Sequence, residues 1–277
     1  MPLSLAEPEA SAAQSGLLWT SPAPPAAGGR PDDVFFVVTG FGPFEGWGLN
    51  PSERLVRQLY ASWQATEGHG HCGVRCCVLQ TAAKPVQQAL ERIYDDMCEL
   101  YEAQPPKSPS RGVRTIYVIH LGVHSATSKF HVESIAHNEA HFGCADEAGW
   151  RPQHQLIENS ASAVPYRSST VDTKALTQYL ATLGHKVRES QDAGRFVCNW
   201  TYYQSIRLAS EKTRVLAGSK CKIHTLFLHI PSFAIIPENE QSQFLNDVMR
   251  FLLHQALQEN HGESFGSVDR EQMAAVL

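Results

Sequence analysis

The chain has 277 residues, of which 43% are hydrophobic and 18% are charged, and its formal net charge is −5 at pH 7. This composition supplies enough apolar material for a core and too little charge for a chain that stays unfolded. Lysine and arginine form no stripe along the sequence, so there is no electrostatic basis for a nucleic-acid partner. The length suits one α/β domain with tails.

Cysteine usage indicates a reducing compartment. The chain contains seven cysteines, an odd number, and no secretory leader is recognised, so free thiols are expected: Cys72, Cys76, Cys77, Cys98, Cys144, Cys198 and Cys221. The apolar runs are far shorter than the roughly 20 residues that span a bilayer. We therefore expect a cytoplasmic protein with no membrane partner.

The two ends of the chain differ in composition from its middle. Residues 1–33 are rich in Ala, Pro, Ser and Gly, which predicts a disordered tail. Residues 259–277 are expected to form a second, loose tail. A single catalytic domain is expected between them, over residues 34–258.

Strand and helix patterns alternate within this domain. Apolar runs predict strands at residues 34–39, 74–79, 115–122 and 225–230. Helical spacing of apolar residues predicts helices at 51–63, 86–101, 173–183, about 195–208 and 240–257. Asn50 and Asp172 stand where N-caps of two of these helices are expected.

Apolar strands that alternate with helices form a sheet covered on both faces. The expected architecture is a three-layer α/β/α sandwich with a central mixed sheet. Ligands of such sheets bind at the loops beyond the strand ends. Three loops are therefore candidates for a site: residues 40–48, 122–133 and 231–237.

Cys198 follows a predicted bend at Ala193 and Gly194 and stands near the start of a predicted helix. The unpaired N–H groups and partial positive charge of a helix N-terminus stabilise a thiolate, and they can also receive an oxyanion. The alternative is a buried structural cysteine, which local sequence alone favours.

His229 and Glu133 could support such a nucleophile. His229 ends an apolar strand just before Pro231, where a base could face the loops. Glu133 is flanked by Val132 and Ile135, and a partly buried carboxylate needs a partner such as a histidine. A core histidine and a solvated glutamate are the alternatives, and spacing does not show whether the three groups meet.

Four segments resemble the pyroglutamyl-peptidase I family of cysteine peptidases (family C15), also called pyrrolidone-carboxylate peptidases. They are VVTGFGPFEGWGLNPS at 37–52, HLGVHSATSKFHVESIAHN at 120–138, QDAGRFVCNWTYY at 191–203 and LFLHIPSF at 226–233. The resemblance runs in order from about residue 34 to residue 257. The QDAGR and TYY elements are more similar to animal members than to bacterial ones.

The resemblance implies a role for each matching residue. Cys198 matches the nucleophile, His229 the base and Glu133 the carboxylate that orients the base. Phe41, Phe44, Phe196 and Val197 match the pocket for the pyroglutamyl ring. The implied substrates are small peptides with an N-terminal pyroglutamate, with no metal and no cofactor.

A pyroglutamyl ring is an uncharged lactam, which aromatic faces and a few hydrogen bonds can select. A free N-terminal ammonium is costly in such a pocket. Two positions depart from the family pattern: Gly143 stands where bacterial members have an arginine, and Val123 where a glutamine is usual.

Three other functions remain open at this stage. His137, His141 and Cys144 have a spacing that could hold a metal in a hydrolase, although Glu139 is displaced from the HExxH pattern. A catalytically weak or inactive relative could serve as a binding module. A thiol hydrolase could act on another small amide or ester.

Overall fold

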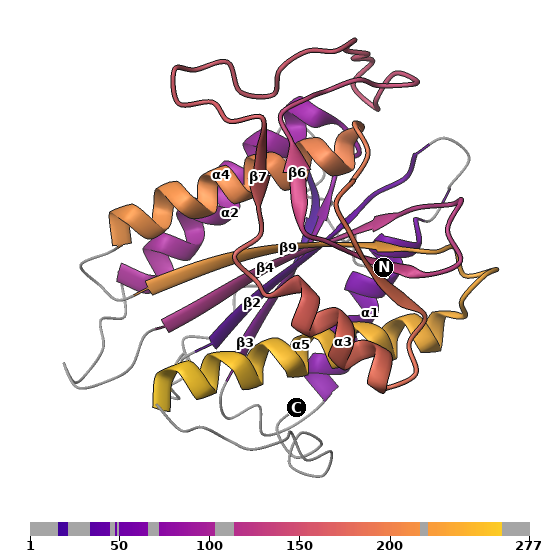
Figure 1. Ribbon diagram of the computed structural model, residues 1–277, viewed down its shortest axis with the longest axis vertical. Helices are drawn as coiled ribbons and strands as arrows, with labels where there is room; N and C mark the ends of the chain where they lie inside the picture. The colour runs from indigo at the N-terminus through magenta and orange to yellow at the C-terminus, as the bar shows by residue number, and fades with distance from the viewer. Residues whose placement is uncertain are drawn as a thin grey trace, which may run out of the picture.

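The central layer is a seven-stranded sheet with strand order β1-β3-β2-β4-β9-β5-β8 (Figure 1). Neighbouring strands are parallel except for β1 against β3 and β5 against β9. The strands are β1 (Leu17–Thr20), β2 (Val34–Phe41), β3 (Cys72–Leu79), β4 (Arg114–Val123), β5 (Phe130–Glu133), β8 (Val187–Ser190) and β9 (Cys221–Ile230). This computed structural model describes residues 16–21, 34–44, 48, 50–65, 72–102, 114–216 and 221–261.

Helices cover both faces of the sheet. They are α1 (Pro51–Ala65), α2 (Ala83–Glu102), α3 (Thr173–Thr182), α4 (Val197–Val215) and α5 (Glu238–His261). Figure 1 shows α2 and α4 on one face and α1, α3 and α5 on the other, and the buried side chains divide into two matching clusters. The expected three-layer α/β/α sandwich with a mixed sheet is therefore confirmed.

The four predicted strands and five predicted helices are all present, with most ends shifted by a few residues. The central strands β2, β4 and β9 are buried along most of their length, which explains why they read as continuous apolar runs. Both predicted caps are confirmed. The Asn50 side chain accepts from Ser52 N at 3.0 Å, and that of Asp172 accepts from Ala175 N at 2.9 Å.

The expectation of a disordered tail over residues 1–33 is wrong for Leu17–Thr20, which form the edge strand β1. Trp19 explains the pairing, because its ring packs edge-on against Tyr60 at 5.6 Å and lies under the Arg57 guanidinium at 4.7 Å. Helix α5 also continues to His261, three residues into the expected C-terminal tail. The other expected tail residues lie outside the described ones.

Short strands were not predicted. They are β5, β8 and the separate two-stranded sheet of β6 (Ile135–His137) and β7 (Tyr166–Ser168). Each has three or four residues, too few for a periodic pattern to stand out. Among the described residues, no helix is long and apolar enough to cross a membrane.

A buried chain of polar side chains ties the helices to the sheet. His120 on β4 bonds Thr39 through Nδ1 and Ser205 through Nε2, each at 2.7 Å. The Tyr94 hydroxyl then contacts Ser205 Oγ at 2.8 Å and Thr225 Oγ1 at 3.1 Å. Burial lowers the pKa of His120 to about 3, so its ring is neutral and can accept as well as donate.

Replacement of Tyr94 by Phe is expected to lower the free energy of unfolding by about 1–3 kcal/mol, because it leaves buried partners short of a hydrogen bond. Chemical denaturation measures the change. Tyr60→Phe is the matched control, since its hydroxyl bonds Gln64 on the surface. Equal effects of the two variants would contradict a special contribution from the buried chain.

Candidate active site

Cys198 is the second residue of helix α4, as the sequence predicted. Gly194, at φ +78°, makes the bend before it. Phe196 is the N-cap and makes no side-chain capping bond, and the first helical hydrogen bond runs from Trp200 N to Phe196 O at 3.1 Å. The backbone N–H groups of residues 197–199 therefore have no acceptor within the helix, and they belong to the same turn as the thiol.

Asn199 fixes the start of α4 to strand β6. Its side-chain nitrogen donates to His137 O at 2.8 Å and to Glu139 O at 3.0 Å, and its oxygen accepts from His137 N at 2.8 Å. The side chain is fully buried. These three bonds hold the helix terminus at a set position relative to the strand that follows Glu133.

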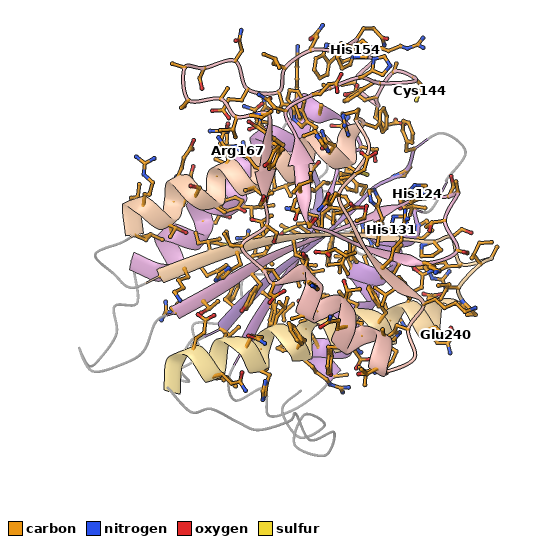
Figure 2. All side chains as sticks on the ribbon, viewed as in Figure 1. His124, His131, Cys144, His154, Arg167 and Glu240 are labelled. Carbon is orange, nitrogen blue, oxygen red and sulfur yellow. The ribbon has the colours of Figure 1, made fainter. Side chains whose placement is uncertain are left out.

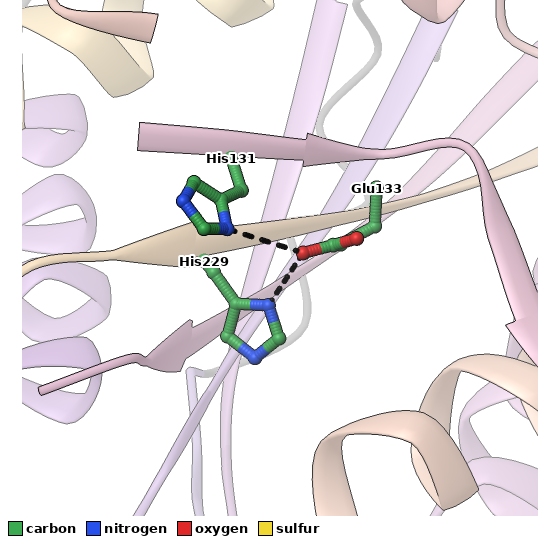
Figure 3. Close-up of side chains that lie close together, drawn as sticks. All are labelled: His131, Glu133 and His229. Carbon is green, nitrogen blue, oxygen red and sulfur yellow. Dashed lines mark hydrogen bonds and ion pairs between the residues drawn. The ribbon is translucent and has the colours of Figure 1, made fainter. Parts of the chain in front are cut away.

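His229 and Glu133 meet across antiparallel strands (Figure 3). His131 on β5 lies opposite His229 on β9, and Glu133 lies opposite Phe227, so Glu133 and His229 are diagonal neighbours on one face of the sheet. His229 Nδ1 is 2.8 Å from Glu133 Oε1, and both side chains are buried. Nδ1 is thus occupied by the carboxylate, which leaves Nε2 for the thiol.

Opposing effects set the charges of this pair. Burial alone raises the pKa of Glu133, but hydrogen bonds from His131 and His229 outweigh it and lower the pKa to about 2. Burial alone lowers the pKa of His229, but hydrogen bonds with Cys198 and Glu133 and their charges raise it to about 9. At neutral pH the site therefore holds an ionised carboxylate and an imidazolium.

Helix α4 also holds the strand that carries the carboxylate. The Tyr202 hydroxyl, one turn beyond Cys198, donates to the backbone oxygen of Glu133 at 2.7 Å. On the other side of β5, Ser134 N donates to Ser190 O at 2.7 Å. The thiol and the carboxylate are consequently positioned by the same helix.

Gly122, the next-to-last residue of β4, lies directly beside the thiol. A Cβ atom at this position would lie 2.9 Å from Cys198 Sγ and 2.7 Å from the Phe227 ring. Both distances are shorter than real Cβ contacts allow. Only glycine lets the thiol sit this close to the strand end.

The four expected pocket residues fall into two environments. Phe44 and Phe196 are half-buried, with ring centroids 5.2 Å apart. Phe41 and Val197 belong to the buried core, where Phe41 packs at 6.4 Å against Phe227. Phe44 and Phe196 thus form a partly accessible aromatic pair, of which Phe196 lies two residues before Cys198, whereas Phe41 and Val197 are buried.

Phe142 was missed by sequence reasoning. Its buried ring packs edge-on against Phe196 at 4.6 Å and thereby supports that pair from below. It belongs to the segment after Glu133 that shows no periodic pattern, so its sequence context contained no signal.

His131 and His124 were also missed. The ring of His124 contacts those of His131 at 5.4 Å and His229 at 5.6 Å, both edge-on, and Figure 2 shows His124 and His131 close together. A signal for His131 did exist, because residues two apart on a strand share a face and Glu133 had been singled out. Without strand β5, that rule could not be applied.

The proposed metal ligands His137, His141 and Cys144 do not come together as a ligand set. His137 Nε2 bonds Gln191 O at 3.1 Å, while the His141 ring stacks on His154 at 3.9 Å. Figure 2 places Cys144 and His154 away from His124 and His131. Within the described part of the chain, the group with metal-ligand spacing is His131, Glu133 and His229.

The titration of His229 reports directly on this geometry. In a Cys198→Ala variant its pKa should fall well below about 9, because the partner that contributes most to raising it is lost while burial still lowers it. NMR of the imidazole ring as a function of pH measures this value. An unchanged titration would contradict contact between Cys198 and His229.

Comparison with known proteins gives a consistent result. The family model described as pyroglutamyl peptidase matches residues 111–249. Pyroglutamyl-peptidase 1 of Rattus norvegicus is 30% identical over 175 residues, which are 61% of this chain and 71% of that protein. A pyrrolidone-carboxylate peptidase of Pectobacterium carotovorum is also 30% identical, over 70% of this chain and 77% of its own length.

A solved structure shares the fold. The pyrrolidone carboxyl peptidase from Thermococcus litoralis superimposes with a TM-score of 0.65 at 19% identity, covering 84% of this chain and 99% of the other. The family match spans half of the chain and includes the segments that carry Glu133, Cys198 and His229. On these grounds the chain belongs to the pyroglutamyl peptidase family.

Proposed function

We propose that this chain is a cysteine peptidase that removes an N-terminal pyroglutamyl residue from peptides. In this proposal Cys198 is the nucleophile, His229 the general acid and base, and Glu133 the group that orients His229. The observation that carries it is the buried pair of Glu133 and His229, whose imidazole is held protonated by Cys198 on one side and the carboxylate on the other.

In the first step the Cys198 thiolate attacks the carbonyl carbon that joins pyroglutamate to the next residue. The carbonyl oxygen becomes an oxyanion, and the uncapped N–H groups of residues 197–199 are the donors that would receive it. His229 then transfers its Nε2 proton to the departing nitrogen. The carbon–nitrogen bond breaks, and pyroglutamate remains bound to Cys198 as a thioester.

In the second step water attacks the thioester. His229, now neutral at Nε2, accepts a proton from the water, and collapse of the second oxyanion releases pyroglutamate and the thiolate. Glu133 remains ionised in both steps. Its 2.8 Å bond to Nδ1 fixes the ring orientation and stabilises the imidazolium each time it forms.

Selection of the substrate follows from the walls around the thiol. The paired rings of Phe44 and Phe196 present an apolar surface that suits the uncharged lactam. Phe41 and Val197 support this wall from the core rather than line it. An ordinary N-terminal ammonium would lose its hydration against these rings without gaining a counter-ion.

The expected partners are small peptides that begin with pyroglutamate, and the expected compartment is the cytoplasm. None of the seven cysteines forms a disulfide in the structure, not even the adjacent pair Cys76 and Cys77, which suits a reducing environment. The absence of a nucleic-acid partner and of a cofactor remains a prediction from the sequence.

The first test compares Cys198→Ala with Cys144→Ala on a pyroglutamyl-coumarin amide under reducing conditions. We expect Cys198→Ala to lower kcat by about 10³-fold or more, as loss of the nucleophile does in other triads. Cys144 is a second half-buried thiol, and its replacement should leave the rate near that of the parent protein. Near-parental turnover by Cys198→Ala would refute the assignment.

The substrate class is tested in the same assay with prolyl and glutaminyl amides of the same fluorophore. The pyroglutamyl substrate should be strongly preferred. Equal rates on all three would reject the lactam pocket and favour a general thiol hydrolase. No turnover of any of them by folded, reduced protein would favour a binding module.

The pH profile tests the role of Glu133. Because the pKa of His229 is raised to about 9, its imidazolium persists at neutral pH and is lost as the pH rises through 9, and kcat/KM should fall there. In Glu133→Gln this alkaline limb should move to lower pH by about one unit or more, since a charge partner is removed. A limb that stays in place would contradict the orienting role.

A further inference from the structure

A second histidine shares the carboxylate that orients His229. His131 Nδ1 lies 3.7 Å from Glu133 Oε1, the same oxygen that His229 Nδ1 contacts at 2.8 Å (Figure 3). His131 stands two residues before Glu133 on β5 and opposite His229 on β9. The proposed catalytic cycle requires one histidine on this carboxylate, so the second one needs an explanation.

The contacts of Thr127 favour a proton on Nε2 of His131. The Thr127 hydroxyl contacts His131 Nε2 at 2.8 Å and donates to Lys129 O at 3.0 Å. A hydroxyl has one proton. When the Thr127 hydroxyl donates that proton to Lys129 O, its oxygen can accept a hydrogen bond from His131 Nε2–H. Nδ1 of His131 then faces the Glu133 carboxylate, either with a second proton that it donates or with a lone pair that a metal ion can take.

Without a proton on His131 Nδ1, two acceptors face each other in a buried place and repel unless a cation lies between them. Glu133 is fully buried, and its other oxygen, Oε2, makes no hydrogen bond of good geometry among the described residues, although the Ser190 side chain also helps to lower the pKa of this carboxyl. His229 adds a third possible metal ligand, and the ligand atoms of His131, Glu133 and His229 all lie within 4.8 Å of one another. This arrangement can be neutralised by protons or by one metal ion.

We propose that His131 Nδ1, His229 Nδ1 and Glu133 Oε1 form an inhibitory site for Zn²⁺. Two imidazoles and one carboxylate are a ligand set that zinc takes in proteins, with a fourth position left for water. Bond lengths of roughly 2.0–2.2 Å require ligand atoms about 3.3 Å apart, close to the observed 2.8 and 3.7 Å. The 2.8 Å contact between His131 Nε2 and Thr127 supplies the outer hydrogen bond that orients a zinc-bound histidine.

Access to this site passes His124. Its ring is half-buried and touches both His131 and His229, whereas those two rings are buried. His124 is therefore the cluster member closest to solvent, and it offers a further imidazole as the ion enters.

Inhibition follows from what zinc replaces, and this part of the inference rests on the proposed function. Binding displaces the proton on His229 Nδ1 and leaves the only ring proton on Nε2. Transfer of that proton to a leaving amine would produce an imidazolate, which is unfavourable. Glu133 would also be drawn from His229 to the metal, so the ring would lose the carboxylate that orients it.

The first experiment measures zinc binding without catalysis. Chelator-treated Cys198→Ala protein is titrated with Zn²⁺ by calorimetry, and we expect one site per chain. Adding His131→Gln should weaken this site by more than the 10–100-fold that loss of an outer hydrogen-bond partner costs. His154→Gln, a histidine paired with Glu139 on the surface, is the control that should bind like the parent.

Thermal unfolding of each variant checks that it is folded, and His131→Cys supplies a second test, because a thiolate ligand should restore zinc binding that Gln removes. No binding by Cys198→Ala, or equal binding by Cys198→Ala with and without His131→Gln, would overturn the proposal. In that case a proton on His131 is the cation that separates the two acceptors.

The second experiment measures inhibition of the active protein, with each variant normalised to its own rate in EDTA. Zinc should inhibit reversibly, and His131→Gln should raise the inhibition constant about tenfold or more. Equal inhibition of both proteins would assign the effect to the Cys198–His229 pair alone and overturn the site. A protein that binds zinc in calorimetry but cleaves no pyroglutamyl substrate would refute the proposed function and leave the zinc site standing.

Discussion

The ion pair between Glu133 and His229 is the interaction on which the rest of the site depends. A buried carboxylate without a partner costs several kcal/mol, and here the partner is an imidazolium 2.8 Å away. This requirement explains the one antiparallel junction inside an otherwise parallel region of the sheet. Strand β5 runs against β9 so that residue 133 and residue 229 are diagonal neighbours on the same face.

Helix α4 brings the thiol to this pair and keeps the distances fixed. Cys198 lies in its first turn, Asn199 makes two hydrogen bonds to β6 and one to Glu139 beyond it, and Tyr202 holds the backbone of Glu133. The missing side chain of Gly122 lets the helix start approach the end of β4. Because one rigid element positions both the thiol and the carboxylate strand, a small shift of α4 would disturb both contacts of His229 together.

The sequence predicted local features of this arrangement well and long-range ones poorly. Cys198 at a helix start and His229 at a strand end could be read from neighbouring residues. The pairing of Glu133 with His229 could not be read in this way, because the two residues are 96 positions apart in the chain. The resemblance to a family supplied it. Trp19 and His131 were missed for a shared reason: each acts through a four-residue strand whose significance comes from its partner strand.

One carboxylate therefore serves two competing purposes. An ionised Glu133 stabilises the imidazolium of His229 because it is buried, and burial makes it equally attractive to any other cation that reaches it. His131 strengthens that competition, because its Nδ1 atom can add a ligand to a bound cation while its Nε2–H donates a hydrogen bond to Thr127. With an apolar side chain at position 131, Glu133 would serve His229 alone. A histidine there makes sense if the same buried charge that supports catalysis also allows a metal ion to stop it.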